Sequence, residues 1–88
     1  PAYNRRSYAA YKLAWCWWNV GEPERAIASL KVVVEAGDPR ILEPALSDLA
    51  RFYAEGGLLA EGQAYFHSIG RDDLAARVAA AAGSPLER

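Results

Sequence analysis

The chain has 88 residues, of which 52% are hydrophobic, and its ten Lys and Arg against eleven Asp and Glu leave a formal net charge of −1. This length makes one domain, and phosphate binding usually needs a clustered basic excess, so the scattered, balanced charge argues against a nucleic-acid partner. One cysteine excludes an internal disulfide and a multi-cysteine metal site, and no apolar run approaches the roughly 20 residues of a membrane span.

Glycine and proline divide the chain into five segments of helical length. The predicted helices span about residues 7–20, 23–35, 40–55, 58–68 and 72–82. Ser7 is the expected N-cap of the first helix, and Pro23 suits the first turn of the second. Pro44 lies early enough in the third helix to be tolerated. No stretch alternates with period two for long enough to predict a strand.

Apolar spacing supports these helices and predicts their core faces. Residues at helical spacing in the first three helices are Ala10, Leu13, Ala14 and Trp17; Ala26, Ile27, Leu30 and Val34; and Leu42, Ala45, Leu46, Leu49, Ala50 and Tyr53. We expect the stripe with Leu13 and Trp17 to face the second helix. Trp17 is therefore predicted to be part of the core.

The chain also repeats itself at an offset of 36 residues, which places Gly21 on Gly57. At this offset the size and chemistry of the residues agree: Leu13 falls on Leu49, Ala14 on Ala50, Trp17 on Tyr53, Ala26 on Gly62, Leu30 on Phe66 and Val33 on Ile69. Small residues allow two antiparallel helices to approach closely. The pattern predicts two helix–turn–helix units that bury their faces by stacking on neighbours.

The segment "AWCWWNVGEPERAIASL" resembles the tetratricopeptide repeat, a unit of about 34 residues. The matching positions are Leu13, Ala14, Trp17, Gly21, Ala26 and Leu30, with Pro39 near the closing position, and then Leu46, Leu49, Ala50, Tyr53, Gly57, Gly62 and Phe66. In the second unit Ile69 replaces the usual alanine and no closing proline follows. The resemblance implies an all-α, right-handed array of two repeats, at about 7–37 and 40–69, with a capping or partial-repeat helix at about 72–82.

Two further expectations concern the parent protein. The segment "YAAYKLAWCWWNVGEPERAIASL" is similar to tetratricopeptide proteins of bacterial cell envelopes, which implies a periplasmic location, with the cytoplasm as the alternative. The chain starts at Pro1 and has no methionine. About three repeats are normally needed for stability, so we expect a fragment of a longer protein or an oligomer.

An aromatic stripe on the first helix is the main candidate binding surface. It consists of Tyr8, Tyr11, Trp15 and Trp18, on a different face from Trp17. In the tetratricopeptide geometry this stripe points into the concave groove, where it would hold a peptide, since Trp and Tyr dominate interface hot spots. The alternative is that it packs on a neighbouring repeat or a symmetry mate. If either is a hot spot, truncation of Trp15 or Trp18 is expected to weaken the binding of a groove partner by about 2 kcal/mol or more.

Polar groove residues are predicted at Asn19 on the first helix and at Ser47, Arg51 and Glu55 on the third. Asn19 would bond a peptide backbone or simply end its helix, and Arg51 would clamp a peptide carboxylate. A solvated intrahelical cluster of Asp48, Arg51 and Glu55 is the alternative.

The sequence gives little support for catalysis or for cofactor binding. Cys16 and His67 stand alone as possible nucleophile and base, and Cys16 is expected to pack as a small apolar side chain. Gly56 and Gly57 lack the Lys and Ser or Thr of a phosphate loop. Asp72, Asp73 and Arg77 fit helix stabilisation. We therefore expect no enzyme, cofactor or metal, but a scaffold that docks a protein or peptide, or alternatively a structural or homo-oligomerising repeat segment.

Overall fold

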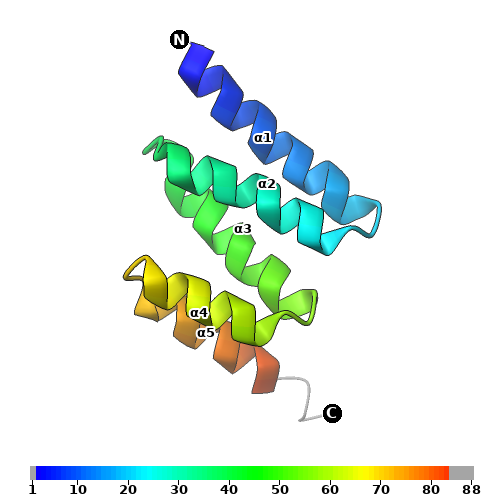
Figure 1. Ribbon diagram of the computed structural model, residues 1–88, viewed down its shortest axis with the longest axis vertical. Coiled ribbons are helices and arrows are strands. Elements are labelled where there is room, and N and C mark those ends of the chain that lie inside the picture. Colours follow the sequence, from blue (N-terminus) through cyan, green and yellow to red (C-terminus); the bar gives the residue numbers. More distant parts are fainter. Residues whose placement is uncertain (1, 84–88) are drawn as a thin grey trace.

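The computed structural model describes residues 2–83, with side chains for residues 6–81, and this part is all-helical without a strand. The helices are α1 (Ala2–Asn19), α2 (Pro23–Ala36), α3 (Leu42–Glu55), α4 (Leu59–Ser68) and α5 (Asp72–Gly83) (Figure 1). The predicted all-α class is confirmed.

Helix α1 begins earlier than the sequence pattern indicated. It starts at Ala2, and Ser7, the predicted N-cap, lies inside the helix and is only 2% exposed. That prediction was wrong, because Ser7 lies on the face of α1 that packs on the protein and is not at a helix end. Pro44 does lie in the first turn of α3, where its missing N–H costs no helical hydrogen bond.

The two helix–turn–helix units are built alike. Gly21 and Gly57 both adopt the left-handed conformation, with φ of 84° and 77°, which glycine tolerates without steric cost. After them, the N–H of Glu22 donates to the carbonyl of Trp17 and that of Leu58 to Tyr53, each at 2.9 Å. The same turn hydrogen bond thus recurs 36 residues later, at the offset of the sequence repeat.

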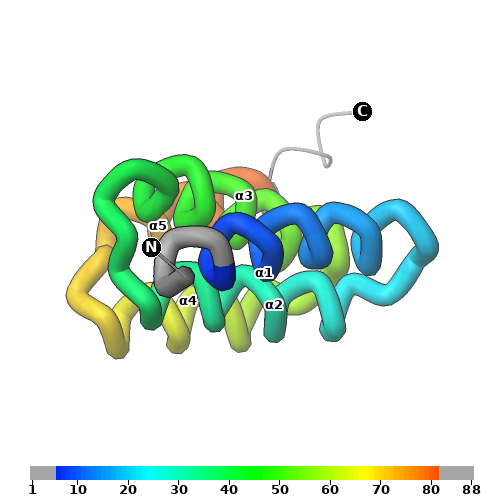
Figure 2. Tube along the Cα trace, turned by 90° about the horizontal axis from the view of Figure 1, so that it is seen from above, coloured from blue at the N-terminus to red at the C-terminus, as the bar shows by residue number. Residues whose placement is uncertain are grey.

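The helices form two layers. Figure 2 shows α1, α3 and α5 on one side and α2 and α4 on the other. Consecutive helices run antiparallel, and α5 packs against both α3 and α4. Helix α3 therefore has α2, α4 and α5 as neighbours, whereas among the described residues α1 packs mainly on α2.

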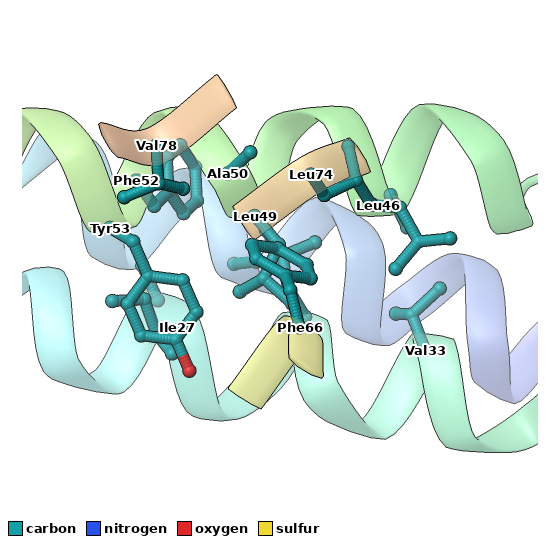
Figure 3. Close-up of a cluster of buried hydrophobic side chains, with 14 of the residues drawn as sticks. Ile27, Val33, Leu46, Leu49, Ala50, Phe52, Tyr53, Phe66, Leu74 and Val78 are labelled. Carbon is teal, nitrogen blue, oxygen red and sulfur yellow. The ribbon is translucent and has the colours of Figure 1, made fainter. Parts of the chain in front are cut away.

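The core lies around α3 (Figure 3). Its largest fully buried side chains are Tyr53, Phe52, Phe66, Leu30, Leu49, Val33 and Val78. Leu74 and Val78 bring α5 into this core. Further along α5, Ala81 is exposed.

The equivalent positions of the two repeats differ in burial. Leu49 and Tyr53 are 0% and 2% exposed, but Leu13 is 48% exposed and Trp17 is only half-buried, beneath the guanidinium of Arg25. The expectation that Leu13 faces α2 was wrong. The part of α1 that contacts the core is instead centred on Ala14, which is fully buried.

Small residues set the distance between paired helices. Ala14 and Ala26 are fully buried in the first pair, and Gly62 is buried in the second. A Cβ atom added at Gly62 would lie 2.7 Å from Cβ and Cγ of Tyr53. Real Cβ atoms do not approach other carbons this closely, so the α3–α4 contact requires glycine here.

Gly62→Ala tests this close approach. Helix propensity alone would stabilise the variant by about 1 kcal/mol, but the overpacking against Tyr53 costs about 1–3 kcal/mol. We expect a net loss in the free energy of unfolding, measured by urea denaturation. Ala60→Gly, at an exposed position of the same helix, measures the propensity effect separately. A more stable Gly62→Ala variant would contradict the packing described here.

Candidate functional site

Two tryptophans join α1 to α3. The indole of Trp18 stacks on the ring of Phe52, with centroids 4.2 Å apart and planes within 3°. Trp15 meets the same ring edge-on at 4.9 Å. Phe52 is 0% exposed, and both tryptophans are half-buried. Trp15 and Trp18 therefore pack on the second helix pair of their own chain.

Asp48 on α3 is the polar centre of this junction. The hydroxyl of Tyr11 donates to Oδ2 of Asp48 at 2.6 Å, and the indole N–H of Trp15 donates to the same oxygen at 3.2 Å. Burial, followed by the hydrogen bond to Asp48, raises the pKa of Tyr11 to about 12. Charged acceptors form the stronger hydrogen bonds, so Asp48 holds both aromatic side chains in place.

Next to this junction lies a hollow of about 360 Å³ between α3 and α5. It is lined by Ser47, Asp48, Ala50, Arg51, Ala54, Glu55, Arg77 and Ala81. Nε of Arg51 lies 3.0 Å from Glu55, and Arg77 donates to the hydroxyl of Ser47 at 3.2 Å. The Arg51 guanidinium also lies 5.8 Å from the ring centroid of Trp15. The hollow thus combines two guanidinium groups, two carboxylates and the edge of an aromatic surface.

Tyr8, Trp18 and Asn19 do not line this hollow and lie in different environments. Tyr8 is 55% exposed, with the ammonium of Lys12 5.2 Å from its ring, and Asn19 is exposed at the end of α1. Trp18 and Glu55 line a separate hollow of about 330 Å³ at the turn ends of the helix pairs. The structure therefore brings Trp15, Ser47, Arg51 and Glu55 together more closely than it does Tyr8 and Asn19.

The sequence patterns did not predict the roles of Asp48 and Arg77. Asp48 was grouped with Arg51 and Glu55, yet it bonds the aromatic residues of α1. Arg77 was expected to stabilise α5, yet it reaches Ser47 on α3. The available signal was chemical: half-buried Tyr and Trp need acceptors for their O–H and N–H groups, and Asp48 lies one helical turn before Phe52.

The residues considered for catalysis lie in unrelated surroundings. Cys16 is exposed on α1, so the expectation that it packs was wrong. Nδ1 of His67 lies 2.6 Å from Oδ1 of Asp72 at the junction of α4 and α5. Within residues 2–83, no group of three or more His, Cys, Asp or Glu side chains is placed to hold a metal ion. No helix in this range has the length and apolar character needed to cross a membrane.

Comparison with protein-family models, curated proteins and solved structures finds no match to this chain. The likeness to tetratricopeptide repeats therefore stays a prediction from the residues themselves. The geometry of the surface formed by α1, α3 and α5 is what bears on function.

Two tyrosines offer a matched test of the junction. Tyr11→Phe removes a hydroxyl bonded to a carboxylate and is expected to cost about 1.5–3 kcal/mol of unfolding free energy. Tyr53→Phe removes a buried hydroxyl that has no hydrogen-bond partner among the described residues, so it should be neutral or stabilising. Chemical denaturation at neutral pH measures both. Equal losses in the two variants would contradict the Tyr11–Asp48 bond.

The same tyrosines predict a loss of stability at alkaline pH. The pKa of Tyr53 is also raised to about 12, by burial and then by the Glu61 carboxylate. A folded-state pKa above the ordinary value of 10.0 means a stabilising contribution that is complete below pH 10 and lost as pH rises towards 12. We expect the unfolding free energy to fall over this window, and less steeply in either Phe variant. A slope unchanged by both substitutions would contradict the shifts.

Proposed function

We propose that this chain is a non-enzymatic protein–protein interaction module, built as a tetratricopeptide-like right-handed array. The two alike helix pairs and their glycine turns support this architecture. The docking surface is the layer formed by α1, α3 and α5, and the partner is a peptide or a helix of another protein.

The hollow between α3 and α5 is the observation that carries the proposal. Its guanidinium groups, Arg51 and Arg77, are held by weak exposed contacts with Glu55 and Ser47. Exposed ion pairs of this kind contribute only about 0–1 kcal/mol, so a ligand carboxylate can replace them at little cost. Trp15 at the edge and Tyr8 further along α1 add apolar contact. A peptide with a carboxylate and an apolar side chain fits this combination.

A second candidate function is a structural repeat segment whose aromatic face packs on neighbouring helices. The contacts of Trp15 and Trp18 with Phe52, and of Tyr11 with Asp48, favour it, because three of the four predicted aromatic side chains are used inside the chain. Truncation of either tryptophan would therefore weaken folding as well as binding. Tyr8, Arg51 and Arg77, which are exposed, are the better probes of a partner.

Selection from a display library of random peptides tests the docking surface. Peptides that bind the whole chain should lose at least about tenfold in affinity when Arg51→Ala and Arg77→Ala are combined, because two charge-assisted contacts of this kind are together worth more than 1.4 kcal/mol. Titration calorimetry measures the affinities. Tyr8→Ala should weaken the same peptides.

Arg25→Ala is the matched control, since Arg25 is an exposed arginine on the opposite layer, over Trp17. It should leave the affinity unchanged. Peptides that bind the combined Arg51→Ala and Arg77→Ala variant and the wild type equally, or a library that yields no binder, would contradict the proposed docking surface.

A further inference from the structure

The outer edge of α1 carries an apolar stripe that the proposed groove does not use. It consists of Ala9, Leu13, Cys16 and Val20, all exposed, with Leu13 48% and Val20 69% exposed. Their spacing of four, three and four residues places them on one side of the helix. The N–H of Val20 still bonds the carbonyl of Cys16 at 3.2 Å, so the stripe is helical to its end.

The equivalent edge of α3, in the second repeat, indicates what kind of surface packs on an edge of this composition. The equivalent residues on α3 are Ala45, Leu49, Phe52 and Gly56. The first three are 0% exposed: α2 packs against α3, and Trp15 and Trp18 of α1 contact Phe52. At Gly56, an added Cβ would lie 3.3 Å from Pro23 and 3.8 Å from Trp18. In the described part of the chain, the equivalent edge of α3 is therefore packed against other helices.

We propose that the outer edge of α1 binds the same edge of a second copy of the chain, with the two α1 helices antiparallel. In the antiparallel arrangement, the stripe of one copy is complementary to the same stripe of the other copy. When the two-fold axis passes midway between Leu13 and Cys16, Leu13 faces the other copy's Cys16, and Val20 faces the other copy's Ala9. Each large side chain thus meets a small one, which is the arrangement that fills a helix–helix interface. The same surface serves both partners, as a two-fold dimer requires.

The charged residues at the two ends of α1 also favour antiparallel pairing. The first half of α1 carries Arg6 and Lys12, both exposed, while Glu22 and Glu24 follow the end of the helix and are also exposed. Antiparallel pairing brings Arg6 near the carboxylates of the other copy. Parallel pairing would place Arg6 beside Arg6 and Glu22 beside Glu22, and like charges in contact are unfavourable. The helix dipoles also oppose each other favourably in the antiparallel pair.

Light scattering and sedimentation of the 88-residue chain over a wide concentration range test the dimer. We expect a concentration-dependent monomer–dimer equilibrium. Leu13→Glu should weaken it at least about 100-fold, because the change enters the interface twice. Ile69→Glu is the control, since Ile69 is also an exposed apolar residue (40%) but lies at the end of α4, away from α1. Circular dichroism checks that both variants fold.

Cysteine pairing tests the direction. In a Cys16→Ala background, a chain with Ala9→Cys is mixed with a chain with Val20→Cys under mild oxidation. Antiparallel pairing predicts mostly mixed disulfide dimers, whereas parallel pairing predicts dimers of like chains. Wild-type Cys16 should also react more slowly with a thiol reagent as the protein concentration rises.

The outcomes separate cleanly. A dimer that Leu13→Glu weakens and Ile69→Glu retains, with mixed disulfides, supports the proposal. A protein that stays monomeric at every concentration would show that a second copy does not bind the outer edge of α1. The edge would then bind a helix pair of another sequence. A dimer indifferent to Leu13→Glu, or one with mainly like-chain disulfides, overturns the surface or the direction. Peptide binding in the groove is independent of all three results.

Discussion

The contact between Phe52 and two tryptophans determines how the two helix pairs fit together. Phe52 is fully buried, Trp18 lies flat on it at 4.2 Å, and Trp15 meets it edge-on at 4.9 Å. Stacked and edge-on contacts both depend on orientation, so rotation of α1 about its axis would lose them together. This rotation decides which residues of α1 face the core, the groove and the outer edge.

The same junction divides the proposed docking surface into a fixed part and an adjustable part. Asp48 accepts hydrogen bonds from Tyr11 and Trp15, and this occupies the carboxylate nearest the aromatic side chains. Arg51 instead pairs with Glu55 in an exposed contact along α3. Half-buried, charge-assisted contacts resist rearrangement, whereas exposed pairs on one helix are worth only about 0.2–0.5 kcal/mol. A partner would therefore meet aromatic side chains already in position and charges free to turn towards it.

Local patterns predicted the helices and turns well, because those features are set within one repeat. Gly21 and Gly57 mark both turns and keep their spacing in the hydrogen bonds that follow them. Burial was less predictable, because it depends on neighbours outside the repeat. Leu13 and Leu49 occupy equivalent positions, yet one is 48% exposed and the other 0%. The bonds to Asp48 join residues far apart in sequence, and no periodicity within a helix indicates such a pairing.

Cys16 shows how the outer edge differs from its buried counterpart. At the equivalent position α3 has Phe52, whose ring is the surface on which Trp18 stacks. A phenylalanine on the open edge of α1 would add a large exposed apolar surface, which favours indiscriminate association. Cysteine keeps the position apolar but small, and leaves Leu13 and Val20 as the larger groups. An edge of this composition suits a reversible contact between complementary small and large side chains. Tyr11, Trp15 and Trp18 of α1 meanwhile contact α3, and Tyr8 is left exposed beside the proposed docking surface.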